Sequence, residues 1–116
     1  MTKLSRHFLR KEFACHCGCG GDTVDAELLT VLEDLRARFG KAIKITSGYR
    51  CEKHNKAVGG GKTSQHLLGR AADVQVAGVP PQNIYNFLNS QYSTTFGIGS
   101  YGTFTHIDTR SAKARW

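Results

Sequence analysis

The chain has 116 residues, of which 40% are hydrophobic and 22% charged, values typical of one soluble globular domain. No apolar run approaches the roughly 18 residues needed to cross a membrane, and the basic amino terminus lacks the apolar stretch of a secretory signal. The net charge of +7 favours an anionic partner, such as nucleic acid, acidic lipid or a cell-wall polymer. Because the basic residues are spread out without interleaved aromatic residues, we expect no specific nucleic-acid surface.

The first predicted elements follow an irregular amino-terminal arm, residues 1–21. A helix is expected between Asp25, a suitable N-cap, and Gly40, a suitable terminator, because apolar residues recur there at helical spacing: Leu28, Val31, Leu32, Leu35 and Phe39. The alternating segment 42–46 predicts a half-buried strand, and residues 52–57 predict a short helical turn.

The second half of the chain predicts further strands around one helix. AADVQV, residues 71–76, has the composition of a buried strand, and Pro81 suits the first turn of a helix with an apolar stripe. Residues 96–110 predict two short strands around a glycine-rich turn, and Trp116 is expected to pack back onto the domain. Since helices and strands do not alternate regularly, we expect a single α+β domain over residues 1–116, with a small, mainly antiparallel sheet and flanking helices.

Four cysteines stand at positions 15, 17, 19 and 51. The C-x-C-x-C spacing of the first three is tighter than the spacing usual between paired ligands of structural zinc sites. A disulfide from one of these residues to Cys51 and free thiols in a reducing compartment both stay open.

Three side chains suit a catalytic zinc site, which takes three protein ligands and leaves a fourth position for water. His66 and Asp73 lie in SQHLLGRAAD, residues 64–73, where Gly69 allows the chain to turn. His106 lies in the predicted strand FTHID and shares one face of it with Asp108. If this strand meets segment 71–76, the three donors can converge, although their spacing alone also fits ordinary buried polar residues.

The motifs around these residues closely resemble one family. SGYR at 47–50, N-x-x-V-G-G at 55–60, S-x-H-x-x-G-x-A-x-D at 64–73 and a histidine in a late strand at 106 resemble the zinc D-Ala-D-Ala carboxypeptidases and peptidoglycan endopeptidases. The likeness runs from about residue 25 to about residue 110, and is greatest to the small single-domain branch of bacteria and bacteriophage lysis enzymes. It implies the fold shared by these peptidases and hedgehog domains.

The resemblance also implies a site and a substrate. It implies one Zn²⁺ held by His66, Asp73 and His106, and Arg50 facing the substrate, where a guanidinium can bind a carboxylate or a developing oxyanion. Ser64 is expected to hold its loop or contact substrate, and Tyr101 to line the cleft or to pack. The expected activity is hydrolysis of a peptidoglycan peptide bond beside a D-amino acid, by a monomer acting at the cell wall or in the periplasm. The positive charge suits an anionic wall, and the missing signal suits release through a phage-made membrane lesion.

One position departs from the family pattern. Relatives carry an acidic general base three residues before the last histidine ligand, where this chain has Thr103, whose hydroxyl cannot accept a proton near neutral pH. We expect Asp108 to serve as the base, because it shares a strand face with His106. The alternatives are that Asp108 orients a ligand histidine in a domain that hydrolyses poorly, or that it forms a salt bridge to Arg110 or Arg50.

Two functions of other classes stay open. Thr103 is compatible with a non-catalytic zinc module of the same fold, as in the hedgehog signalling domain. A basic nucleic-acid binder that uses the cysteines is disfavoured by their spacing and by the lack of interleaved aromatic residues.

Overall fold

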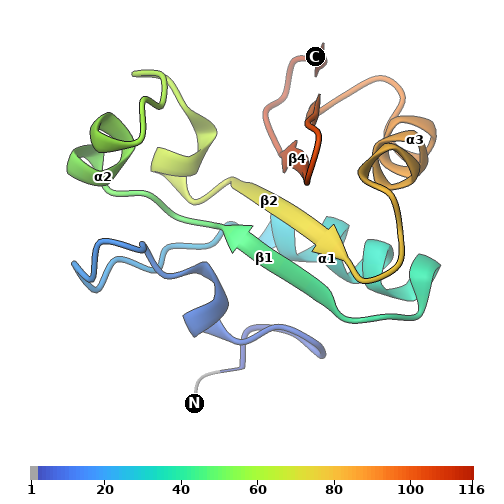
Figure 1. Cartoon of the computed structure of the whole chain (residues 1–116), viewed down its shortest axis with the longest axis horizontal. Coiled ribbons are helices and arrows are strands. Elements are labelled where there is room, and N and C mark those ends of the chain that lie inside the picture. Colours follow the sequence, from blue (N-terminus) through green and yellow to red (C-terminus); the bar gives the residue numbers. More distant parts are fainter. Residues whose placement is uncertain (1–2) are drawn as a thin grey trace.

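The computed structural model describes residues 3–116, which form an α+β fold (Figure 1). Its five-stranded sheet has the order β1-β2-β4-β3-β5, and every neighbouring pair is antiparallel except β3 and β5. The strands are β1 (Ile43–Ser47), β2 (Ala71–Val76), β3 (Gly97–Ser100), β4 (Thr105–Asp108) and β5 (Ala114–Arg115). The predicted fold class is confirmed.

Three α-helices are present among the described residues: α1 (Ala26–Phe39), α2 (Glu52–Ala57) and α3 (Pro81–Gln91). Asp25 caps α1 by accepting a hydrogen bond from the Leu28 backbone N–H, and Gly40 ends it in the left-handed conformation, as predicted. Two 3₁₀ helices, η1 (Arg10–Phe13) and η2 (Gln65–Leu68), complete the set. None of the described helices is long and apolar enough to cross a membrane.

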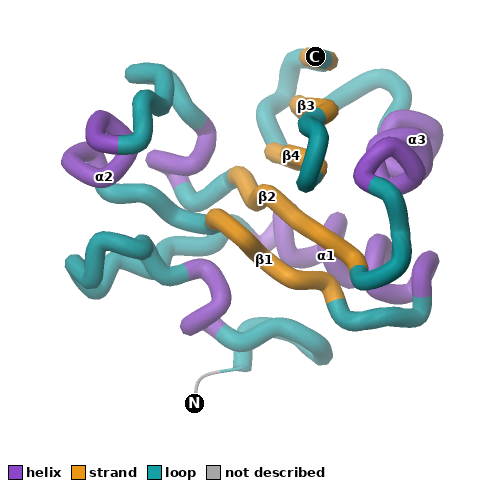
Figure 2. Tube along the Cα trace, in the orientation of Figure 1, coloured by secondary structure: helices purple, strands orange, loops and turns teal. Residues whose placement is uncertain are grey.

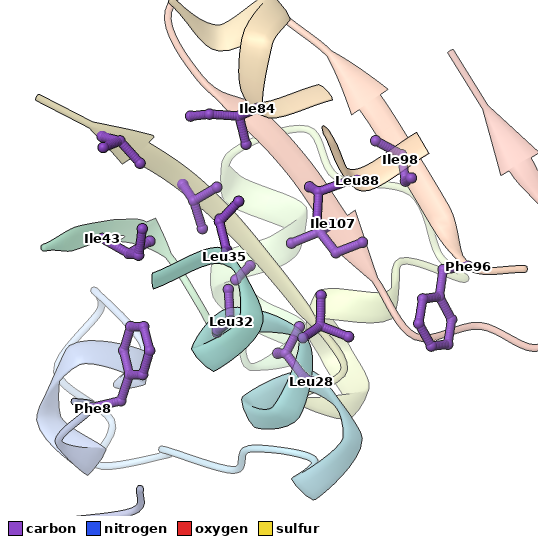
Figure 3. Packing of buried hydrophobic residues seen from close by; sticks show 14 of the residues in the cluster. Phe8, Leu28, Leu32, Leu35, Ile43, Ile84, Leu88, Phe96, Ile98 and Ile107 are labelled. Carbon is purple, nitrogen blue, oxygen red and sulfur yellow. The ribbon is translucent and has the colours of Figure 1, made fainter. Parts of the chain in front are cut away.

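The hydrophobic core lies on one face of the sheet. Figures 1 and 2 show α1 behind β1 and β2, and α3 beside the short strands. Figure 3 shows the apolar side chains that meet between these layers, with residues of α1, α3, β3 and β4 pointing toward one another. Ala72, Val74 and Ile107 face this core, so the residues that alternate with them in β2 and β4 face the opposite side.

Both ends of the chain are held more firmly than the sequence predicts. In the amino-terminal arm, Phe8 and Phe13 are buried in the core, and Glu33 of α1 accepts hydrogen bonds from the Ser5 hydroxyl (2.6 Å) and the His7 backbone N–H (2.8 Å). At the other end, the backbone of Trp116 pairs with Ile98 and Ser100 of β3. The carboxy-terminal tail therefore packs back as predicted, and it does so as an additional edge of the sheet.

Gly69 connects η2 to β2 and so sets the position of His66 relative to Asp73. Its φ is +68°, a conformation that favours glycine, and a Cβ atom there would lie 2.5 Å from the Thr23 carbonyl oxygen. Its carbonyl accepts a hydrogen bond from the backbone N–H of Asp25, the α1 cap (2.8 Å). The turn that ends η2 is therefore locked against the start of α1.

We predict that Gly69→Ala lowers the free energy of unfolding by about 1–3 kcal/mol, because it adds backbone strain and a steric clash. Urea unfolding measures this loss. Gly61→Ala is the matched control, because an added Cβ there contacts nothing within 4 Å. Equal stability of the two variants would contradict the role given to Gly69.

Candidate metal centre and substrate cleft

The three predicted metal ligands lie together on the face of the sheet opposite the core. Asp73 and His106 are direct partners in the antiparallel pairing of β2 and β4, so both side chains emerge on the same face. His106 Nδ1 lies 3.0 Å from Asp73 Oδ1, and His66 Nε2 lies 3.4 Å from the same oxygen. One donor atom from each residue fits within a 4.8 Å span. The structure therefore brings together the set that the motifs predict.

The local fold prepares the His66 ring for a metal ion. The Ser64 hydroxyl caps η2 by accepting a hydrogen bond from the His66 backbone N–H, which fixes the start of the turn. The ring Nδ1 lies 2.7 Å from the Gly48 carbonyl oxygen, which only accepts, so Nδ1 carries the proton. Nε2 is then a free lone pair, and among residues 3–116 it is buried without a hydrogen-bond partner. A cation at the cluster would satisfy this otherwise costly group.

The charges of Asp73 and His106 also suit a cation. Burial opposes ionisation of Asp73, but the hydrogen bond from His106 and the nearby imidazole of His66 outweigh it and lower the pKa of the carboxyl to about 2. Burial likewise opposes protonation of His106, yet its contacts with Asp108 and Asp73 raise the pKa of the ring. Two carboxylates therefore draw positive charge to this point, and a bound metal ion would supply it in place of the proton.

Asp108 holds the opposite side of the His106 ring. It is fully buried, its Oδ2 lies 2.7 Å from His106 Nε2, and Arg110 binds both of its oxygens at 2.8 Å. The pKa of the Asp108 carboxyl is far below its usual range; burial opposes this, but hydrogen bonds from His106 and Arg110 outweigh it. Asp108 does not line the cleft, whereas it does form the expected ion pair with Arg110. Of the roles expected for Asp108, this geometry favours orienting His106 over proton transfer.

Arg50 is held at the rim of the cluster by the neighbouring motifs. Its Nε donates to the Ser47 hydroxyl (3.3 Å), its Nη1 donates to Asn55 Oδ1 (3.1 Å), and its Nη2 lies 3.7 Å from Asp73 Oδ2. Asn55 is buried and donates in turn to the Gly61 carbonyl (2.9 Å). The sequence reasoning gave Asn55 no role. The structure shows that the N-x-x-V-G-G motif serves to position the guanidinium.

An open cleft of about 480 Å³ leads to these side chains. Arg50, Ser64 and Tyr101 all line it, together with the three predicted ligands. Thr103 is exposed and lines a different hollow, beside Lys44 and Gln75.

Trp116 is a cleft residue that sequence reasoning treated as packing only. Its ring lies 5.1 Å from that of His106, and its indole N–H donates to the Tyr101 hydroxyl (2.9 Å). Tyr101 in turn stacks on Phe104 at 4.5 Å. The carboxy-terminal residue therefore forms part of an aromatic wall. Gly99 is the residue of the sequence that reflects this packing, because a Cβ atom there would lie 2.5 Å from the indole nitrogen of Trp116.

This arrangement defines a class of site: two histidines and an aspartate that can hold a metal ion at the floor of an open cleft, with an arginine beside them. The family model for Peptidase M15 matches residues 6–108, most of the chain, so the protein belongs to the M15 family of zinc metallopeptidases. No curated protein was found that matches the chain. The predicted resemblance to the D-Ala-D-Ala carboxypeptidase-like peptidases is confirmed.

We predict that Asp108→Asn weakens zinc binding at this cluster by about 10–100-fold, because the carboxylate that fixes and polarises His106 is lost. Isothermal titration of zinc into the metal-free protein measures the change. Asp34→Asn, an exposed carboxylate of α1 bonded to Tyr92, is the control. If zinc affinity is unchanged while turnover disappears, Asp108 is instead the proton-transfer group.

Proposed function

We propose that this protein hydrolyses peptide bonds in peptidoglycan, next to a D-amino acid, with one zinc ion held by His66, Asp73 and His106. The observation that carries the proposal is the buried, unpartnered Nε2 of His66, aimed at Asp73 and His106 on the floor of an open cleft. Membership of the M15 family supports a zinc metallopeptidase. The motif resemblance supports the cell-wall substrate, as either a carboxypeptidase or a cross-link endopeptidase.

When bound, zinc would act as a Lewis acid toward the scissile carbonyl and would lower the pKa of water to about 7. The protein supplies one carboxylate and two imidazoles to this ion. Asp73 is ionised at neutral pH, His66 is fixed in the tautomer that leaves Nε2 free, and Asp108 fixes the His106 ring from its far nitrogen.

Arg50 binds the negative charge of the substrate or of the transition state. Two of its nitrogens are held by Ser47 and Asn55, so the guanidinium loses little conformational entropy when it binds. Its position near Asp73 supports a role in stabilising the charge that develops on the carbonyl oxygen during hydrolysis. The same group suits the terminal carboxylate of a stem peptide.

The walls of the cleft provide further contacts for a peptide. The Ser64 hydroxyl oxygen accepts from His66, which leaves its proton available to a substrate carbonyl. The Tyr101 hydroxyl, which accepts from Trp116, is equally free to donate. The aromatic wall of Tyr101, Phe104 and Trp116 suits the apolar parts of a stem peptide, and the net charge of +7 suits the anionic wall around it.

A second candidate function is a zinc-binding module of the same fold without catalysis. The observation that favours it is that Asp73 has the only acidic side chain among the described residues lining the cleft. Among the described residues, the cleft lining therefore holds no second acidic side chain that could serve as the general base found in relatives. An activity assay separates the two candidates.

We predict that the zinc-loaded protein releases peptide fragments from purified sacculi. Mass analysis of the fragments identifies the bond and its stereochemistry, and so separates carboxypeptidase from endopeptidase action. A chelator should abolish release and added zinc should restore it, while His66→Ala should stay inactive with zinc. Absence of fragments from a zinc-loaded, folded protein would leave the non-catalytic module as the function.

We predict that Arg50→Lys lowers kcat/KM on the identified substrate by about 10²–10³-fold, because a lysine cannot reproduce two parallel hydrogen bonds. Steady-state kinetics measures this loss. Zinc binding should stay unchanged, and Arg6→Lys on the exposed arm is the matched control. Wild-type kinetics in Arg50→Lys would remove Arg50 from the substrate site.

A further inference from the structure

Four cysteines gather at a second place, outside the cleft. Cys15, Cys17 and Cys19 lie in the amino-terminal arm just after η1, and Cys51 is the N-cap of α2. One sulfur from each fits within a span of 4.8 Å, and all four are free thiols. Segments more than 30 residues apart therefore contribute to one compact group of soft donor atoms.

The distances between these sulfurs match a tetrahedral thiolate site. Cys15 and Cys17 lie 3.4 Å apart, Cys17 and Cys51 lie 3.5 Å apart, and Cys15 and Cys51 lie 3.8 Å apart. A tetrahedron with zinc–sulfur bonds of about 2.3 Å has its sulfurs about 3.8 Å from one another. Closing the cluster around an ion therefore requires shifts of only a few tenths of an ångström for these three.

Backbone amides are already directed at the sulfurs. The N–H groups of Cys51, His54 and Gly21 donate to Cys15, Cys51 and Cys19 respectively, each at 3.4 Å. Amide donors of this kind suit metal-bound sulfur, because a metal-bound cysteine is a thiolate and accepts hydrogen bonds. They also offset the negative charge that four thiolates would place around a divalent ion.

Glycines in the loop explain how the sulfurs of three cysteines so close in sequence can point to one place. Gly18 lies between Cys17 and Cys19, and Gly20 directly follows Cys19; their φ values of +79° and +84° are open to glycine but unfavourable for other residues. The loop closes on itself through a hydrogen bond from the Cys15 N–H to the Gly21 carbonyl (2.8 Å). The C-x-C-x-C spacing is too tight for the backbone of a zinc knuckle. This loop follows a different backbone path.

We propose that Cys15, Cys17, Cys19 and Cys51 bind a second zinc ion in a closed tetrathiolate site. Four protein ligands leave no position for water, so the site is structural and separate from the cluster in the cleft. Thiolates select zinc among the common divalent cations, whereas calcium and magnesium prefer oxygen ligands.

The role of this ion is to fasten the arm beside the substrate-binding arginine. Cys51 directly follows Arg50, and the Tyr49 N–H donates to the Phe13 carbonyl in the arm (2.9 Å). Gly21 lies against the Tyr49 ring, since a Cβ atom there would be 2.5 Å from its Cε2. Loss of the ion therefore loosens residues 15–21 of the arm and the segment that carries Arg50.

Metal content and cobalt spectra test this site independently of any activity. Protein purified under reducing conditions should hold two zinc ions per chain by elemental analysis, against one in Cys19→Ser and one in His66→Ala. Cobalt-substituted protein should show intense thiolate-to-cobalt absorption in the near ultraviolet. That absorption should persist in His66→Ala and disappear in Cys19→Ser.

Three results would overturn the proposal. The first is one zinc per chain that Cys19→Ser retains and His66→Ala loses. The second is a wild-type cobalt spectrum without thiolate absorption, which needs no variant to fold. The third is fewer than four reactive thiols in the denatured, unreduced protein, which would show that disulfides occupy these residues instead. A failed peptidase assay would leave all three measurements unaffected.

Discussion

The register between β2 and β4 is the constraint on which the rest of the molecule depends. Pairing Asp73 with His106 places both on one face, and the same alternation sends Ala72, Val74 and Ile107 into the core. A slip of one residue would bury the charged groups and expose the apolar ones. The hydrophobic core therefore specifies the geometry of the polar cluster, although none of its residues lines the cleft.

Burying this many polar groups is tolerated because nearly all of them are paired. Asp108 is bound by His106 and by Arg110, and the proton of His66 Nδ1 goes to the Gly48 carbonyl. Among the described residues, Gln65 Oε1 and His66 Nε2 are buried without a hydrogen-bond partner, and the imidazole nitrogen is the one that a metal ion would bind. Folding and metal binding are consequently linked, because an ion that binds only the folded chain stabilises it.

The sequence predicted the helices, the main strands and the convergence of His66, Asp73 and His106, because these depend on periodicity and on motifs with fixed spacing. It gave the contacts of Asp108 with His106 and with Arg110 only as alternatives, and it predicted only packing for Trp116, because both depend on how strands from different parts of the chain align. In the sequence, these contacts are reflected only by glycine at alternate positions of β3. A Cβ atom at Gly97 would meet Asp108, and one at Gly99 would meet Trp116. These two glycines mark the face of β3 against which another side chain packs, and only the structure identifies that side chain.

The segment from Gly48 to Cys51 connects both clusters through four successive residues. Gly48 accepts from the His66 ring, Tyr49 donates to Phe13 of the arm, Arg50 donates from its backbone to the His66 carbonyl (3.1 Å), and Cys51 donates to Cys15. A segment without regular secondary structure is thereby fixed from several directions at once. Because Arg50 lies between the cleft and the cysteines, the position of its guanidinium depends on the order of both. The SGYR motif is thus a structural junction in addition to its proposed contact with the substrate.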